Sequence, residues 1–204
     1  VEETPSAGLG TLLVNILGVL LFGFSEFGPK LMQTIMLGGA FVLMFAAMRK
    51  IFGKLPAAVG VIVAAIYTSS PLIAKYGNVK EQYMIACMVA AASLLILRQT
   101  GGKWWFGFLA GAVAAWAPLF KETGVSVIGA IGLFVIIQPI FKARTWKQTG
   151  IDIMLLLGGA AVSLGPLFIW IIGWDVKTAM PLYFVWDAIA GLLPKASAAA
   201  PGAG

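Results

Sequence analysis

The sequence contains no histidine, one cysteine and few charged residues. Only 11% of its 204 residues are Asp, Glu, Lys or Arg, whereas soluble domains carry about 25%. The absence of histidine excludes a His-ligated haem, chlorophyll or zinc site built from this chain. The single cysteine, Cys87, excludes an intrachain disulfide. The basic residues are scattered rather than clustered on one arm, so no nucleic acid is expected as a partner.

What the sequence has instead is apolar residues. Hydrophobic residues make up 60% of it, and the mean hydropathy is +0.96. A helix that crosses a bilayer needs about 20 mostly apolar residues. Six apolar runs, uncharged apart from Asp152 in the last, approach or reach this length: Leu31–Met48, Leu55–Ala74, Gln82–Leu97, Trp104–Phe120, Thr123–Phe141 and Gly150–Gly173. We therefore predict an all-α fold, a polytopic transmembrane helical bundle of about six spanning helices.

Two further apolar stretches, Leu9–Phe24 and Met180–Leu193, are short and interrupted by Asn15 and Asp187 respectively. Each stretch is compatible with a span, an interfacial helix or a re-entrant helix. We predict a single transmembrane domain that covers most of the chain and a low-complexity tail. The predicted parts are an outer juxtamembrane segment at 1–30, six spans within 31–173, a short apolar segment at 174–194 (together the domain 1–194) and a flexible Ala/Gly/Pro tail at 195–204.

Residue 1 is valine rather than methionine. The sequence is therefore expected to be a piece of a longer protein.

The charges in the loops predict the orientation of the bundle. Alternate loops carry eight basic residues and no acid: Arg49, Lys50, Lys54, Arg98, Lys103, Lys142, Arg144 and Lys147. The loops on the opposite face carry five basic and four acidic residues. Short loops rich in Lys and Arg stay in the cytoplasm. The loops that hold Glu81 and Lys121 are therefore predicted to be periplasmic or extracellular.

Tryptophan and glycine supply expectations about packing. Tryptophans near both predicted interfaces, such as Trp104 and Trp146 beside the basic loops, predict aromatic belts. Small residues let transmembrane helices approach closely. Three glycine pairs are therefore predicted to lie at helix contacts: Gly107 with Gly111, Gly38 with Gly39, and Gly158 with Gly159.

Two polar clusters fall on the predicted outer face. In the first, around Lys75, Lys80 and Glu81, the spacing of Asn78 and Glu81 predicts a capping box at the start of a helix. In the second, Lys121 ends one helix, Glu122 follows, and Thr123 is predicted to cap the next helix. A carboxylate can act as an acid, a base or a metal ligand, and a lysine can hold a phosphate. The residues alone indicate a membrane protein with an outward-facing polar site.

The order of several short segments resembles the N-terminal half of the GT-C membrane glycosyltransferases. It is similar in pattern to protein O-mannosyltransferases and to bacterial aminoarabinose transferases of lipid A, over roughly Thr4 to Ile140. The segments are Thr4-Pro5, Leu21-Phe22-Gly23-Phe24-Ser25-Glu26, Lys30-Leu31, Arg49-Lys50-Ile51-Phe52-Gly53, Ser70-Pro71-Leu72-Ile73-Ala74, Glu81, Leu109-Ala110-Gly111-Ala112-Val113-Ala114 and Leu119-Phe120-Lys121. This resemblance implies transfer of a sugar from a polyprenyl-phosphate donor on the outer side of the membrane, with membrane lipids as further partners.

The resemblance also assigns roles to individual residues. Glu81 corresponds to an acidic residue of the second outer loop, which is catalytic or binds a metal, so a divalent metal is a candidate cofactor. Lys121 corresponds to a lysine near the donor phosphate, and Lys80 and Lys75 are further candidates for that phosphate. Asn78, Glu122 and Tyr83 are candidate supporting residues. Leu9–Phe24 corresponds to a juxtamembrane helix of the first outer loop.

Two positions depart from the family pattern. The main catalytic carboxylate of the family precedes the segment that matches Thr4-Pro5, and here only Val1, Glu2 and Glu3 stand before it. Lys30 occupies a position where the family has an arginine.

The sequence is also compatible with two other functions. One is a non-catalytic integral subunit with a transferase-like fold, bound to other membrane subunits in a larger complex. The other is a transporter fragment, which is weakened because the six helix interiors hold no ionisable residue except Asp152, predicted to lie at a helix edge.

Overall fold

The computed structural model describes residues 8–70 and 78–173, and these residues form helices joined by short connections, with no strand among them. The chain divides into two compact units, Val1–Gly165 and Pro166–Gly204, and the tertiary contacts discussed below lie within the first. The elements are α1 (Leu9–Phe22), α2 (Phe27–Phe52), α3 (Lys54–Thr68), α5 (Lys80–Gln99), α6 (Trp105–Phe120), the 3-10 helix η1 (Glu122–Gly124), α7 (Val125–Ile140) and α8 (Trp146–Gly173). The predicted all-α class is confirmed.

Each of the six predicted spans corresponds to one of these helices. Among the described residues, four stretches are long and apolar enough to cross a membrane: Phe27–Phe52, Lys80–Gln99, Glu122–Ile140 and Trp146–Ile169. The helix α2 runs beyond the predicted span at both ends, through Lys30 and through Arg49 and Lys50. Long basic side chains can extend their charged ends toward the interface while their stems follow an apolar helix. Basic residues therefore did not mark the helix ends as closely as the sequence suggested.

The helices α3 and α6 are shorter, with 15 and 16 residues. The predicted span Leu55–Ala74 continues past the end of α3 at Thr68, and its last four residues, 71–74, lie outside the described residues. The stretch Leu9–Phe24 is helical as far as Phe22, where α1 ends after 14 residues. The apolar segment 180–193 and the tail 195–204 lie outside the described residues.

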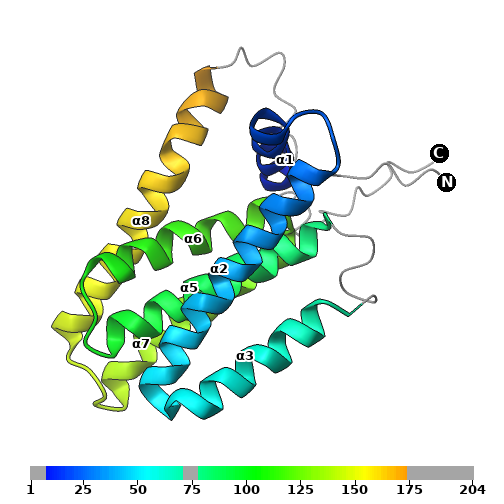
Figure 1. Cartoon of the computed structure of the whole chain (residues 1–204). Helices are drawn as coiled ribbons and strands as arrows, with labels where there is room; N and C mark the ends of the chain where they lie inside the picture. The colour runs from blue at the N-terminus through cyan, green and yellow to red at the C-terminus, as the bar shows by residue number, and fades with distance from the viewer. Residues whose placement is uncertain (1–7, 71–77, 174–204) are drawn as a thin grey trace, which may run out of the picture. The chain divides into compact units, whose positions relative to one another are not determined.

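The core is centred on α5, which packs against both α2 and α6 (Figure 1). Several of the buried residues on both helices are small, which lets the two helices approach closely. The buried core residues of these two helices are Tyr83, Cys87, Ala91, Leu94 and Leu95 on α5 and Ala110, Ala114, Ala117 and Phe120 on α6.

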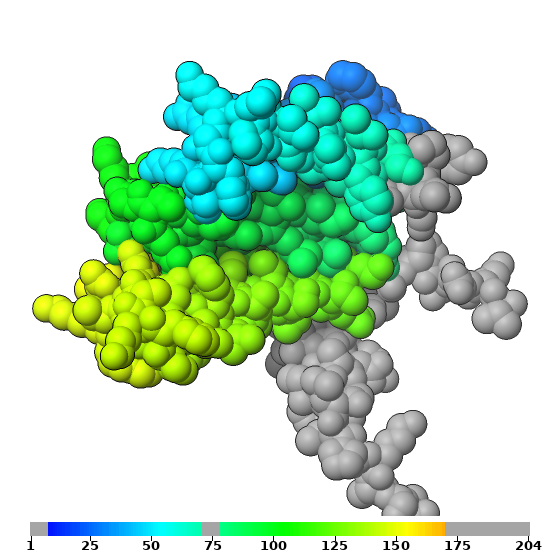
Figure 2. Space-filling view, turned by 90° about the horizontal axis from the view of Figure 1, so that it is seen from below, coloured from blue at the N-terminus to red at the C-terminus, as the bar shows by residue number. Residues whose placement is uncertain are grey.

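The outer faces of the helices expose large apolar side chains. On α3, which packs on α2, Leu55, Ile62 and Ile66 are exposed, and Figure 2 shows this helix in cyan with its outward side uncovered. Apolar surface on this scale marks a membrane or interaction surface. The described helices therefore match a lipid environment.

Two of the three predicted glycine pairs lie at a helix contact. A Cβ atom added to Gly111 would collide with the backbone of Leu156, and one added to Gly159 would collide with the backbone of Phe108, so α6 and α8 touch here. The prediction for Gly38 and Gly39 is wrong, because an added Cβ would meet nothing within 4 Å at either position.

Candidate functional site

Glu81 and Lys121, the first two residues singled out from the sequence, form an ion pair. Glu81 lies in the first turn of α5, and Lys121 is the residue that ends α6. The Lys121 Nζ atom lies 3.0 Å from Oε1 of Glu81, and their side chains are 36% and 30% exposed. The two groups are close enough to act on one ligand, and both remain accessible to it.

An aromatic contact joins α5 and α6 within two residues of this pair in the sequence. Tyr83 on α5 stacks on Phe120 on α6, with ring centroids 5.3 Å apart and planes at 12°. Both rings are fully buried. Lys121 follows Phe120 and adopts extended backbone geometry, with φ −154° and ψ 139°. The stack therefore sets the position of the Lys121 backbone relative to the first turn of α5.

The hydroxyl group of Tyr83 ties the start of α5 to α2. Its Oη atom lies 3.0 Å from the carbonyl oxygen of Pro29 and 2.8 Å from Oδ1 of Asn78. Asn78 has φ 54°, a left-handed conformation that asparagine tolerates better than most residues. The predicted capping box is wrong: Val79 is the N-cap of α5, and no side chain caps it. The Asn78 side chain instead contacts the buried tyrosine.

The remaining predicted residues differ in their placement. Lys80 opens α5 and is half-buried, whereas Glu122 opens η1 and is exposed. Thr123 does not cap α7, because η1 intervenes and Gly124 is the N-cap. The Thr123 hydroxyl group lies 3.2 Å from the Met84 sulfur. Lys75 lies outside the described residues.

The helix α1 begins beside this site. A Cβ atom added to Gly10 would lie 3.0 Å from the ring of Phe120, and one added to Gly8 would collide with the Phe120 backbone. Two oxygens on α1, Thr11 Oγ1 and Asn15 Oδ1, are buried without a hydrogen-bond partner. The first turn of α1 is thus packed against the end of α6 that carries Lys121.

A polar connection that the sequence analysis missed joins α2, α3 and α5 at the same end. Gln33 Nε2 donates to Gln82 Oε1, and Gln82 Nε2 donates to the Thr68 carbonyl oxygen at 3.0 Å. The Val79 N–H donates to Gln33 Oε1 at 3.0 Å. A pocket of about 330 Å³ lies beside these amides, lined also by Thr34, Leu37, Gly38, Phe41 and Ser69. The sequence contained one indication of this connection, because Gln33 and Gln82 are uncharged polar residues within apolar runs.

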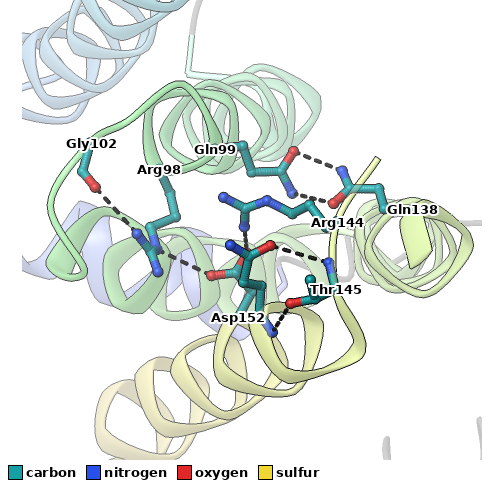
Figure 3. A network of polar contacts seen from close by, with 8 residues as sticks. Arg98, Gln99, Gly102, Gln138, Arg144, Thr145 and Asp152 are labelled. Carbon is teal, nitrogen blue, oxygen red and sulfur yellow. Dashed lines mark hydrogen bonds and ion pairs between the residues drawn. The ribbon is translucent and has the colours of Figure 1, made fainter. Parts of the chain in front are cut away.

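Asp152 belongs to a second polar cluster that the sequence analysis did not predict. It lies in the second turn of α8, near the start of that helix, and its side chain is 1% exposed. Arg98 Nε lies 3.1 Å from its Oδ1, and Arg144 donates to its Oδ2 (Figure 3). Arg98 is in the last turn of α5, so this cluster is at the opposite end of that helix from Glu81.

The described residues do not assemble a recognisable metal site. Within 8–70 and 78–173, no three or more His, Cys, Asp or Glu side chains gather where they could hold an ion. The assignment of Glu81 as a metal ligand stays a prediction, and no chemical step below depends on it.

Comparison with known proteins gives one match. The family model described as dolichyl-phosphate-mannose-protein mannosyltransferase matches residues 9–170. No curated protein and no solved structure matches the chain. The matched range contains every described helix except the last residues of α8, and includes both Glu81 and Lys121. The chain, with its several membrane-length apolar helices, therefore belongs to this family of multi-pass GT-C membrane glycosyltransferases.

Proposed function

We propose that this protein transfers a sugar from a polyprenyl-phosphate donor on the outer face of the membrane, and that Glu81 and Lys121 act at the donor. The observation that carries the proposal is the partly exposed ion pair between the start of α5 and the end of α6. The family description names dolichyl-phosphate-mannose as a donor and protein as an acceptor.

Lys121 supplies the charge that a donor phosphate needs. An ammonium group is a compact positive charge with three donors, and it can contact several phosphate oxygens. At 36% exposure, the Lys121 side chain is reachable yet partly removed from water, where its attraction for an anion is stronger than in bulk solvent. The ammonium would hold the donor and stabilise the phosphate that departs.

Glu81 supplies an oxygen that can accept a proton. In the proposed step, the hydroxyl oxygen of the acceptor forms a bond to the anomeric carbon of the sugar. The bond from that carbon to the phosphate oxygen breaks, and its electron pair leaves with the polyprenyl phosphate. The hydroxyl proton passes to the Glu81 carboxylate, as in general base catalysis.

The sidedness of the site rests on the charges at the two ends of the bundle. The end with Arg98 and Arg144 belongs to the loops that carry eight basic residues. The end with Glu81 and Lys121 has mixed charge, including the Lys30–Glu26 pair at 2.7 Å, whose ammonium lowers the pKa of the Glu26 carboxyl. The basic end is expected in the cytoplasm, which puts Glu81 on the outer side.

The test separates donor binding from chemistry. The protein in lipid nanodiscs is given polyprenyl-phosphate-mannose and a serine-containing peptide; donor binding and mannose transfer are measured separately. We expect Lys121→Gln to weaken donor binding about tenfold, the loss of about 1.4 kcal/mol. We expect Glu81→Gln to lower the transfer rate about 10²–10⁴-fold with donor binding nearly unchanged.

Matched controls remove the same charges elsewhere. Glu26→Gln alters an exposed carboxylate at the same end, and Lys54→Gln alters an exposed lysine outside the site. Both are expected to leave binding and transfer unchanged. If Lys54→Gln weakens donor binding as much as Lys121→Gln, the phosphate role of Lys121 is wrong. If folded Glu81→Gln transfers mannose at the original rate, Glu81 is not the base.

A further inference from the structure

Two guanidinium groups share one carboxylate at the end of the bundle opposite Glu81. Arg98 comes from the last turn of α5, Arg144 from the connection between α7 and α8, and Asp152 from α8. Asp152 is 1% exposed, whereas the arginine side chains are 21% and 18% exposed. The carboxylate lies at the bottom of the cluster, and the edges of both arginines remain accessible.

The charge of this cluster is not balanced. Two positive groups face one negative group, and Asp152 is the one acid at this end among the described residues. Leaving a charge without a partner near a membrane is costly. The cluster therefore favours a second anion.

The arginines also retain hydrogen-bond donors. Arg98 uses Nε for Asp152 and Nη1 for the Gly102 carbonyl oxygen at 3.3 Å, and Arg144 uses Nη1 for Asp152. Within the part of the chain that the structure describes, Arg98 Nη2 and the Nε and Nη2 atoms of Arg144 have no hydrogen-bond partner. Since an arginine presents its donors in a planar fork, these atoms can engage oxygens of a further anion.

Further polar side chains lie close to the cluster. Gln99 and Gln138 exchange hydrogen bonds of 2.8 and 3.3 Å beside Arg144 (Figure 3). One turn before Asp152, the Thr149 hydroxyl oxygen is buried without a partner. The two arginines are thus positioned by Asp152, and the nearby Thr149 hydroxyl group is available to a ligand.

The position of the cluster indicates which anion it takes. Lys103 and Lys142 lie in the adjoining connections and Lys147 lies in the first turn of α8; all three are exposed, as are Trp104 and Trp146. Exposed tryptophans beside basic residues are typical of a membrane interface, and basic pockets between helices on the cytoplasmic side bind anionic lipid head groups. We propose that Arg98 and Arg144, positioned by Asp152, bind a phosphate group, carried either by an anionic lipid or by a soluble phosphate compound.

This site is independent of the proposed glycosyl transfer. It uses the C-terminal end of α5, whereas Glu81 and its lysine partner lie at the N-terminal end. Binding here is measured without a sugar donor, so failure of one proposal leaves the other standing.

The experiment measures retention of bound lipid by the intact protein. Native mass spectrometry on protein from detergent compares phosphatidylglycerol with phosphatidylcholine, and inorganic phosphate is then added as a competitor. We expect preferential retention of phosphatidylglycerol, and we expect Arg144→Gln to weaken it about tenfold. Arg144→Lys keeps the charge but removes the fork, so it is expected to lose most of the preference as well.

Arg49→Gln is the matched control, since Arg49 is an exposed arginine in the last turn of α2 and its replacement removes the same charge. It is expected to leave the preference intact. Equal losses in Arg49→Gln and Arg144→Gln, or an unmodified protein that neither prefers phosphatidylglycerol nor retains inorganic phosphate, would overturn the proposal. Displacement of the lipid by inorganic phosphate assigns the site to phosphate from either source, and no displacement assigns it to the lipid alone. Should Arg144→Gln not fold, Arg144→Lys and the unmodified protein still decide the outcome.

Discussion

The ring of Tyr83 on α5 stacks on the ring of Phe120 on α6, with centroids 5.3 Å apart. Tyr83 stands two residues after Glu81, and Phe120 stands immediately before Lys121. The buried contact between the two aromatic side chains therefore fixes the backbones that carry the two charged residues. The geometry of the candidate site depends on this packing as well as on the charges themselves.

Tyr83→Phe tests this coupling. The substitution keeps the stacked ring but removes the hydroxyl group that contacts Pro29 and Asn78. A buried carbonyl oxygen would lose its partner, so we expect a loss of about 1–3 kcal/mol in the free energy of unfolding. Donor binding should change little, because the stack remains. Tyr83→Ala removes the ring as well and should lose both stability and donor binding. If Tyr83→Phe is as stable as the unmodified protein, the hydroxyl contacts contribute nothing to stability.

The contact between α6 and α8 gives a prediction with a built-in control. Gly111→Ala places a methyl group against the Leu156 backbone, which cannot move aside as a side chain can. Overpacking of this kind costs about 1–3 kcal/mol. Gly38→Ala meets open space and is expected to be neutral or to stabilise α2 by about 0.5–1 kcal/mol. Thermal unfolding in detergent measures both, and equal melting temperatures would show that α6 and α8 do not touch closely at Gly111.

The Asp152 cluster is expected to be strongly non-additive. Asp152→Asn leaves two arginines without their shared negative charge, and we expect a loss of about 3–5 kcal/mol in the free energy of unfolding. Replacing all three charged residues together, as Arg98→Met, Asp152→Leu and Arg144→Met, is expected to cost less than Asp152→Asn alone, because no charge is then left unpaired. Additive losses across these variants would contradict a coupled cluster.

Cys87 provides a probe of folding and of membrane orientation. It is the one cysteine in the sequence, and it is buried against the core. We expect a maleimide to leave it unmodified in the folded protein and to react on unfolding. Because Cys87 does not react in the folded protein, a single introduced cysteine can be labelled selectively. Lys103→Cys and Glu26→Cys place exposed thiols at the two ends of the bundle.

In intact cells, an impermeant maleimide should label Glu26→Cys and should label Lys103→Cys only after the membrane is permeabilised. The reverse pattern would place Glu81 and Lys121 in the cytoplasm and contradict the proposed outer site.

The membrane helices were predictable because their signal is local. A span requires a continuous apolar run, and six such runs led to the six helices from α2 to α8. The resemblance to GT-C glycosyltransferases was likewise carried by the order of short segments, and the family match over 9–170 agrees with it. Glu81 and Lys121 stood out because charges are rare beside apolar runs.

The exact ends of helices and their caps were less predictable. Asn78 and Thr123 have the residue types of helix caps, but Asn78 contacts Tyr83 and Thr123 lies in a 3-10 turn. Such residues have several hydrogen-bond options. The surrounding packing selects among them, and a local pattern does not contain that packing.

The sequence by itself determined that this protein is a multi-pass helical membrane protein with its charges segregated by loop, because hydropathy and charge act residue by residue. Only the tertiary structure decided which groups meet: Arg98 with Asp152 across 54 residues, and Gly111 rather than Gly38 at a helix contact. These outcomes depend on which face of each helix turns toward a neighbour. When nearly every face of a helix is apolar, hydrophobicity does not distinguish the faces, and close packing and buried polar pairing make the choice.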